Sequence, residues 1–293
     1  MFDVFRERRR QGKRTIGYPA EAPTLPDRYR GLPVLDDSRC PDGCKSCVES
    51  CPTDAIGRDS RGLALDMGRC LFCTDCLEAC PEGAIRFTHD YRMATRNRSD
   101  LVVRSGVELA LAEPLDARMR KLFGRSLKLR QVSAGGDNAE ESDLNVLGTI
   151  VFDIGRFGIQ FVASPRHADG LVITGPVAEN MKSALLDAYE SVPSPKLVIV
   201  VGASAISGGP FRGHPEVSDG TDRLLPIDLY IPGFPPHPMT ILDGLLRLLG
   251  RLEGMPERIR AEEPPAPPPA SGPDPLAPIV ASTATVEGPP TSS

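Results

Sequence analysis

Residues 44–56 read CKSCVESCPTDAI and residues 73–85 read CTDCLEACPEGAI, so one thirteen-residue pattern occurs twice at a shift of 29 residues. All eight cysteines of the 293-residue chain lie between Cys40 and Cys80, within or just before these two stretches. Duplication of a short unit is best explained by a two-lobed module. The sequence therefore predicts a cysteine-dense module followed by a cysteine-free one.

The cysteine spacing predicts iron–sulfur clusters. The second motif, Cys70-x2-Cys73-x2-Cys76-x3-Cys80-Pro81, is the bacterial ferredoxin run, in which three close thiolates hold one 4Fe–4S cluster and the fourth reaches the other cluster. The first motif, Cys40-x3-Cys44-x2-Cys47-x3-Cys51-Pro52, has one extra residue in its first gap. We therefore predict two 4Fe–4S clusters, one on Cys40, Cys44, Cys47 and Cys80 and the other on Cys51, Cys70, Cys73 and Cys76.

Zinc sites and disulfides fit the cysteine pattern less well. Paired CxxC motifs also bind structural zinc, but two zinc sites do not explain the twin CxxCxxxCP pattern. Disulfides need an oxidising compartment, and the opening residues MFDVFRERRR contain no apolar core of a secretory signal.

Composition excludes several classes of protein. A formal net charge of −5 argues against a basic nucleic-acid binder. No apolar stretch approaches the ~18 residues of a membrane-spanning helix. The chain contains neither a GxGxxG nor a Walker pattern, so we expect no nucleotide as partner, just as the charge leads us to expect no nucleic acid.

The two ends of the chain differ from its middle. Residues 1–39 form a basic N-terminal segment and a Pro- and Gly-rich lead-in. Phe2 and Phe5 lie on one side of a possible short helix. This segment either lies on a membrane surface or an acidic partner, or is a frayed, solvated end. The final residues, 258–293, are rich in proline, and we expect a disordered tail.

Between the ends, an alternation of strands and helices predicts a parallel sheet. Residues 90–125 are polar, basic and mostly helix-compatible, and we place a connector at 101–125 between a module at 40–100 and a sheet domain at 126–257. The expected strands are Leu127–Val132, Gly158–Ala163, Leu171–Thr174, Leu197–Val201 and Asp228–Ile231. The expected helices are Ser142–Phe152, Ala178–Tyr189 and Thr240–Leu252.

Longer stretches carry a specific resemblance. Residues 1–100 resemble the two-cluster ferredoxin subunit of formate hydrogenlyase and complex I, on RTIGYP, RYRGLP, the cysteine runs and FTHDYRMATRNRSDL. Residues from about 120 to 252 resemble the small subunit of membrane-bound nickel–iron hydrogenases and the 20-kDa, N2-cluster subunit of complex I. The matching stretches are LFGRSLKLRQV, FDIGRFGI, ASPRHADGLVITGPV, PKLVIVVGASAISGGPF and LYIPGFPPHP. The resemblance implies a fusion of an α+β ferredoxin-like module and an α/β flavodoxin-like parallel-sheet domain.

The resemblance also identifies a degenerate site. The family holds a further, proximal cluster on four cysteines, and the matching positions here are Asp137, Glu140, Ser204 and Phe234. Three oxygen ligands and a phenyl ring are not a plausible set for an iron–sulfur cluster. For Asp137 and Glu140 two other roles stay open, a capping box at the start of the 142–152 helix and binding of a hard metal ion.

A second loop matches the family as well. Arg166, His167 and Asp169 match the SPRHAD loop, which in the family faces the cluster and the large catalytic subunit. Ordinary hydrogen bonding within the loop is the alternative role of these three residues.

The resemblance implies a non-catalytic electron-transfer subunit of a membrane-associated hydrogenase-like or complex I-like oxidoreductase complex. We expect no catalytic residues. The implied partners are a hydrogenase-large-subunit-like or complex I 49-kDa-like protein and other subunits, which hold the chain peripherally on the cytoplasmic face of the inner (cell) membrane. The alternative is a structural or assembly scaffold whose ferredoxin half serves another redox partner.

Overall fold

The computed structural model describes residues 2–252, 254–256 and 258–259. The predicted tail lies outside the described residues from Arg260 onward. At the other end, α1 (Phe2–Gln11) is the short helix expected from the spacing of Phe2 and Phe5, and none of its residues is buried.

The cysteine module consists of short strands and single helical turns. The strands are β1 (Pro33–Leu35), β2 (Ile56–Asp59), β3 (Gly62–Asp66), β4 (Ile85–Phe87) and β5 (Val102–Arg104), and the turns are α2 (Ser46–Glu49) and α3 (Asp75–Glu78). β1 pairs antiparallel with β4, and β2, β3 and β5 form an antiparallel sheet. α2 and α3 occupy equivalent places in the two repeats, 29 residues apart. The sequence repeat is therefore a structural repeat.

The second half contains the expected parallel sheet. Its strands are β7 (Leu127–Ser133), β8 (Ile159–Phe161), β9 (Gly170–Thr174), β10 (Leu197–Val201) and β11 (Leu229–Ile231). They lie in the order β11-β10-β9-β7-β8, and every neighbouring pair is parallel. β10 has the predicted bounds, because a continuous apolar run suits a strand that is buried on both faces.

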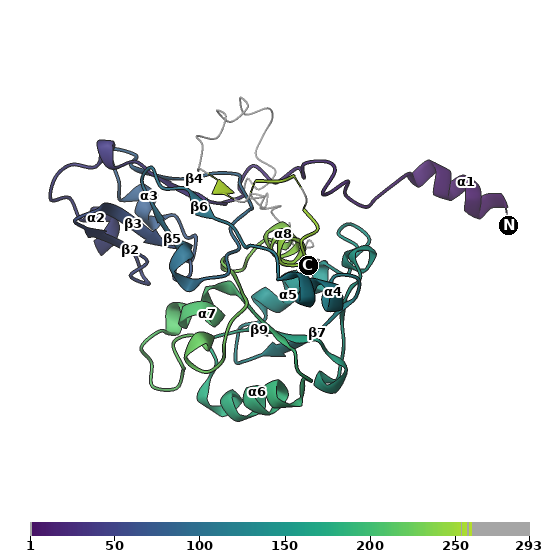
Figure 1. The fold of residues 1–293 in the computed structure, drawn as a ribbon. Helices are drawn as coiled ribbons and strands as arrows, with labels where there is room; N and C mark the ends of the chain where they lie inside the picture. Colours follow the sequence, from purple (N-terminus) through teal and green to yellow (C-terminus); the bar gives the residue numbers. More distant parts are fainter. Residues whose placement is uncertain (1, 253, 257, 260–293) are drawn as a thin grey trace, which may run out of the picture. The chain divides into compact units, whose positions relative to one another are not determined.

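Helices cover both faces of this sheet. Val172 and Ile199 belong to the apolar cluster that includes residues of α5 (Ala139–Val146) and α8 (Pro238–Leu248). Leu171 and Val198 belong to the cluster that includes residues of α6 (Glu179–Ser191) and α7 (Gly202–Ser207). Successive strand residues thus point to opposite faces. Figure 1 shows α5 and α6 on opposite sides of β7 and β9.

One apolar core runs through both halves of the chain. Leu65 and Met67 of the cysteine module share a cluster with Val200 and Ile206 of the sheet domain. Thr95 and Tyr230 form an antiparallel bridge, with Thr95 N donating to Tyr230 O at 3.0 Å. The two halves are therefore packed together rather than joined by a free linker.

The expected helix-compatible connector is wrong in part. Val102–Arg104 is β5 of the cysteine module, and β6 (Leu109–Ala110) pairs antiparallel with β12 (Arg258–Ile259). Only α4 (Ala117–Phe123) is helical as expected. The apolar residues of this region are buried as strands because their partners come from distant parts of the chain.

Two helices begin before the residues that their sequence patterns indicate. α5 starts at Ala139 and ends at Val146, and Ile150, which the predicted 142–152 helix contained, is 71% exposed in the turn that follows. α8 starts at Pro238, where the His237 ring accepts a hydrogen bond from Met239 N at 3.1 Å. Short 3-10 turns occupy Asp37–Arg39, Arg98–Leu101, Ile154–Phe157, Pro165–His167, Gly209–Phe211 and Thr221–Arg223.

Candidate metal centre

The two helical turns place equivalent cysteines in equivalent surroundings. Cys47 in α2 and Cys76 in α3 are buried, at 5% and 6% exposure. Cys51 and Cys80 follow these turns, and each sulfur accepts a backbone N–H at 3.3 Å, from Ala55 and Ala84 respectively. All eight cysteines are free thiols.

The thiols fall into two electrostatic groups. Burial raises the pKa of Cys47, and Cys40, Cys80 and Cys44 raise it further. Burial likewise raises the pKa of Cys70 to about 12, with smaller contributions from Cys76, Cys51 and Cys73. The neighbours of Cys47 and of Cys70 are the residues predicted to share a cluster with each, including the exchange of the fourth ligand between repeats. The two sets also lie close to each other, since Cys47 contributes to the raised pKa of Cys76. The ligand assignment itself stays a prediction.

This arrangement suits a cofactor that carries positive charge. Buried thiols with a pKa of about 12, as at Cys70 and Cys76, are neutral at neutral pH unless a metal takes the place of the proton. Thiolates are the ligands of iron–sulfur clusters, so the donor set fits the predicted group.

Within residues 2–252, 254–256 and 258–259, no three Cys, His, Asp or Glu side chains are arranged to hold a single metal ion. A cubane contains four irons, and its thiolates stand farther apart than the ligands of one ion.

The four positions of the degenerate site all follow strands of the parallel sheet, beyond their carboxyl ends. Asp137 and Glu140 follow β7, Ser204 follows β10, and Phe234 follows β11. Ala203 N donates to Gly233 O at 2.8 Å, which links the loop of Phe234 to α7. Open α/β sheets bind ligands at this edge, so the topology brings the four residues to one place without supplying a thiol.

Glu140 lies buried within this region beyond the carboxyl ends of the strands. It is 1% exposed, and neither of its carboxylate oxygens makes a close hydrogen bond with a described residue, although the Ser204 hydroxyl lies near enough to lower its pKa. Burial raises the pKa of Glu140 to about 7, and the carboxylates of Asp137 and Glu141 raise it further. The side chain lies against the Cα of Gly202, where an added Cβ would overlap it. A glycine at the end of β10 therefore makes room for the carboxyl.

The capping-box role of Asp137 and Glu140 does not describe the structure fully, and hard-metal binding stays a prediction. Asp137 Oδ1 accepts a hydrogen bond from Ala139 N at 3.0 Å, as expected near a helix start. Glu140 is buried and does not complete a capping box, since the helix begins two positions after Asp137 and not at 142. Its neighbour Glu141 accepts a bond from Thr174 Oγ1 at 2.6 Å.

The loop of Arg166, His167 and Asp169 lies at the amino ends of the strands, opposite the carboxyl ends that the degenerate site follows. Asp169 Oδ2 accepts from Lys128 N at 2.7 Å, at the start of β7, and Leu197 N donates to Asp169 O at the start of β10. The expectation that this loop faces the cluster site is wrong, because the loop leads into β9 from its amino end. Arg166 and His167 are both exposed, and their role toward a partner stays a prediction.

The structure also shows contacts that no sequence pattern predicts. The Tyr18 hydroxyl donates to Asp243 at 2.8 Å, and Arg247 Nε donates to the same carboxylate at 2.8 Å. Tyr18 lies more than two hundred residues before Asp243, so local spacing carries no sign of this bond. Arg58 donates to Cys40 Sγ at 2.9 Å, 18 residues away in the sequence.

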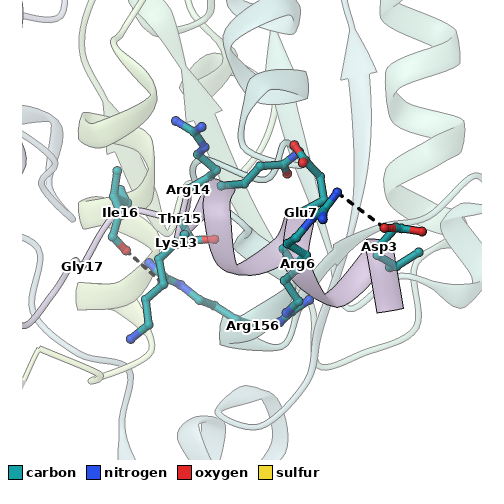
Figure 2. A pocket seen from close by; sticks show the side chains of 13 residues that line it. Asp3, Arg6, Glu7, Lys13, Arg14, Thr15, Ile16, Gly17 and Arg156 are labelled. Atoms are coloured by element: carbon teal, nitrogen blue, oxygen red, sulfur yellow. Dashed lines mark hydrogen bonds and ion pairs between the residues drawn. The ribbon is translucent and has the colours of Figure 1, made fainter. Parts of the chain in front are cut away.

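A cavity of about 1000 Å³ lies beside the N-terminal segment (Figure 2). Figure 2 shows Arg156 reaching the lead-in, where its Nη1 donates to Ile16 O at 3.0 Å and its Nη2 to Tyr18 O at 2.9 Å. Basic side chains line the cavity, and none of its described lining residues is a cysteine. It is therefore separate from the predicted metal ligands.

Two family models match this chain. Residues 138–248 match "NADH ubiquinone oxidoreductase, 20 Kd subunit", and residues 34–85 match "4Fe-4S dicluster domain". These matches cover the sheet domain and the cysteine module respectively.

Similar curated proteins are subunits of redox complexes. Formate hydrogenlyase subunit 7 of Escherichia coli is 39% identical over 172 residues, which are 59% of this chain and 66% of that protein. The probable membrane-bound hydrogenase subunit mbhJ of Pyrococcus furiosus is 38% identical over 149 residues, 51% of this chain and 87% of that protein. An NADH-quinone oxidoreductase subunit of Citrifermentans bemidjiense is 44% identical over 110 residues, which are 38% of this chain and 64% of that protein.

Proposed function

Because the chain belongs to the family of the 20 kDa subunit of NADH ubiquinone oxidoreductase and also carries a 4Fe-4S dicluster domain, we propose that it is an electron-transfer subunit of a membrane-associated oxidoreductase complex. The complex is hydrogenase-like or complex I-like, as the relatives are. The chain carries electrons for the complex and turns over no substrate itself.

The grouping of the eight thiols is the observation that carries this proposal. Two 4Fe–4S clusters, one on Cys40, Cys44, Cys47 and Cys80 and one on Cys51, Cys70, Cys73 and Cys76, supply the one-electron carriers when bound. The chain's own groups hold the sulfurs in place, donate N–H bonds to them and exclude water from the buried pair Cys47 and Cys76. Such bonds and the solvent exposure of a cluster set its reduction potential.

The sheet domain is the docking half in this proposal. Numbered along the chain, its strands have the order 2-1-3-4-5, which supports a flavodoxin-like topology. Its partner is a protein like the hydrogenase large subunit or the 49-kDa subunit of complex I, with Arg166 and His167 among the contacts. We also propose a division of the chain into 1–39, 40–100, 101–125, 126–257 and 258–293. Two strands cross its boundaries: β5 lies in the connector range but pairs with the cysteine module, and β12 lies in the tail range but pairs with β6.

We place the chain peripherally on the cytoplasmic face of the cell membrane, held by other subunits. The names of two relatives, a membrane-bound hydrogenase subunit and a formate hydrogenlyase subunit, support this location. Among the described residues, no helix combines the length and the apolar character needed to cross a bilayer.

One observation favours a scaffold role for the sheet domain. Glu140 fills the interior of the degenerate site and lies against Gly202, so the site has been repacked rather than left open. In that case the ferredoxin half serves another acceptor. The large-subunit partner discriminates the two roles, because a partner without cysteine ligands for nickel and iron supports the scaffold.

Iron and sulfide analysis of the anaerobically purified full chain tests the proposal. We expect about eight irons per chain and two 4Fe–4S signals in low-temperature paramagnetic resonance after reduction. About twelve irons would show that the degenerate site holds a cluster. Four or fewer would contradict the two-cluster assignment.

A further inference from the structure

Arg58 lies directly on the sulfur of a predicted cluster ligand. Its Nη1 is 2.9 Å from Cys40 Sγ and also donates to Pro41 O at 3.3 Å. Its Nη2 is 4.0 Å from Asp42 Oδ1. Pro41 and Asp42 belong to the first gap of the motif, which has one residue more than the corresponding gap of the second repeat. The longer gap thus supplies a carbonyl oxygen that accepts from the guanidinium and a carboxylate at the outer limit of an ion pair.

The second repeat has a phenyl ring where the first has this cation. The shift of 29 residues takes Arg58 to Phe87, whose ring packs against Phe72 with 5.5 Å between centroids. Cys70, the counterpart of Cys40, accepts a backbone N–H from Phe72 at 3.3 Å. The first cysteine of one motif therefore receives a charged donor and that of the other a neutral one. The backbone bonds to the last cysteine of each motif are alike, so these bonds do not distinguish the two repeats.

Two further differences between the repeats, in the loops after Cys44 and Cys73, also make the first repeat more positive. Lys45 is replaced by Thr74, and Ser46 by Asp75. The Ser46 hydroxyl lies 3.7 Å from Cys44 Sγ. The loop after Cys44 is thus two charges more positive than the loop after Cys73.

We propose that Arg58 sets the order of the two reduction potentials, so that the cluster held by Cys40 is reduced before the cluster held by Cys70. Reduction adds one negative charge to a cluster, and a guanidinium at a ligating sulfur stabilises the reduced form more than the oxidised form. A chain that has taken up one electron then holds it on the cluster bound by Cys40. This inference rests on the proposed function, since it concerns two clusters on the eight cysteines.

The test is a redox titration of the full chain followed by paramagnetic resonance, on the wild type and on Arg58→Gln. In the wild type the two clusters should titrate at separate potentials. In Arg58→Gln the higher potential should fall while the lower one stays. We expect the ratio of reduced to oxidised cluster at a fixed potential to fall at least tenfold, which is about 59 mV for a one-electron couple.

Two more variants locate the cause of the shift. Arg61→Gln is the matched control, because Arg61 is 73% exposed and pairs with Asp59; it should shift neither potential. Arg58→Lys keeps a cation near Cys40 and should retain most of the separation. If the higher potential falls as far in Arg58→Lys as in Arg58→Gln, the charge at Cys40 is not the cause and the inference is wrong. The same holds if the potentials of both clusters shift together.

Iron content separates this inference from the proposed function. About eight irons in a wild type whose two clusters titrate together would refute the order of potentials and leave the proposed function standing. A wild type that binds no cluster would refute both. If Arg58→Gln loses iron, Arg58→Lys carries the test on its own, and the inference is wrong if its two clusters titrate together although a cation is still present.

Discussion

The Tyr18 hydroxyl donates a hydrogen bond of 2.8 Å to Asp243, 225 residues further along the chain. Asp243 lies in α8, is 0% exposed and also binds Arg247 at 2.8 Å. Burial raises the pKa of Tyr18, so its hydroxyl keeps its proton and remains a donor. The lead-in before the cysteines is therefore tied to the last helix of the sheet domain.

Removal of this donor should destabilise the chain. In Tyr18→Phe the buried carboxylate loses one of its two partners, and we expect a loss of about 1–3 kcal/mol in the free energy of unfolding. Tyr29→Phe is the control, because the Tyr29 hydroxyl meets the neutral hydroxyl of Thr240 at 3.2 Å. Urea unfolding of the cluster-loaded chain measures both. Equal losses in the two variants would show that the charge of Asp243 does not matter.

Stability should depend on pH through Glu140. Burial, followed by Asp137 and Glu141, raises its pKa from an ordinary 4.5 to about 7 in the folded chain. The folded state thus binds a proton that the unfolded state releases between these values, so stability falls as pH rises through this window. The free energy of unfolding of Glu140→Gln, relative to that of the wild type, should therefore rise by about 2–3 kcal/mol from pH 5 to pH 8.

Denaturant midpoints of both chains at the two pH values measure this gain. Because acid also damages clusters, the comparison is between variant and wild type at each pH. Glu190→Gln, at an exposed position of α6, is the control for the loss of one carboxylate from a helix. A gain for Glu140→Gln that is the same at pH 5 and pH 8 would contradict the raised pKa.

Gly202 and Glu140 should be coupled. Ala at 202 needs the left-handed backbone that Gly202 adopts at φ +91 and overlaps the Glu140 side chain, so we expect Gly202→Ala to cost about 2–4 kcal/mol. Glu140→Ala removes the overlap but not the backbone cost. The double variant should therefore be more stable than the sum of the two single changes by about 1 kcal/mol, and strict additivity would show that the residues do not touch.

A single cysteine should not restore the degenerate site. Phe234→Cys supplies one thiol, while Asp137, Glu140 and Ser204 still offer only oxygen. Iron should remain at about eight per chain, with no third signal in paramagnetic resonance. A third signal in this variant would mean that the ligands of the site are other residues.

Local sequence patterns predict those elements whose conformation depends least on residues far away in the sequence. The apolar run Leu197–Val201 is a buried strand wherever it lies, and the cysteine spacing is explained by repeat and motif alone. β5 and β6 escape such prediction because strands of three and two residues depend on partners far away in sequence. Long-range contacts also decide the surroundings of Glu140, since only the fold reveals that Gly202 lies against it. The sequence thus indicates candidate ligands, and only the fold reveals the groups that surround them.

The apolar core that contains both Leu65 and Val200 constrains how the two halves can exist. Cutting the chain between them would expose the buried face of each piece to water. The shared core therefore makes the cysteine module and the sheet domain one folding unit, so that neither half can be exchanged without the other.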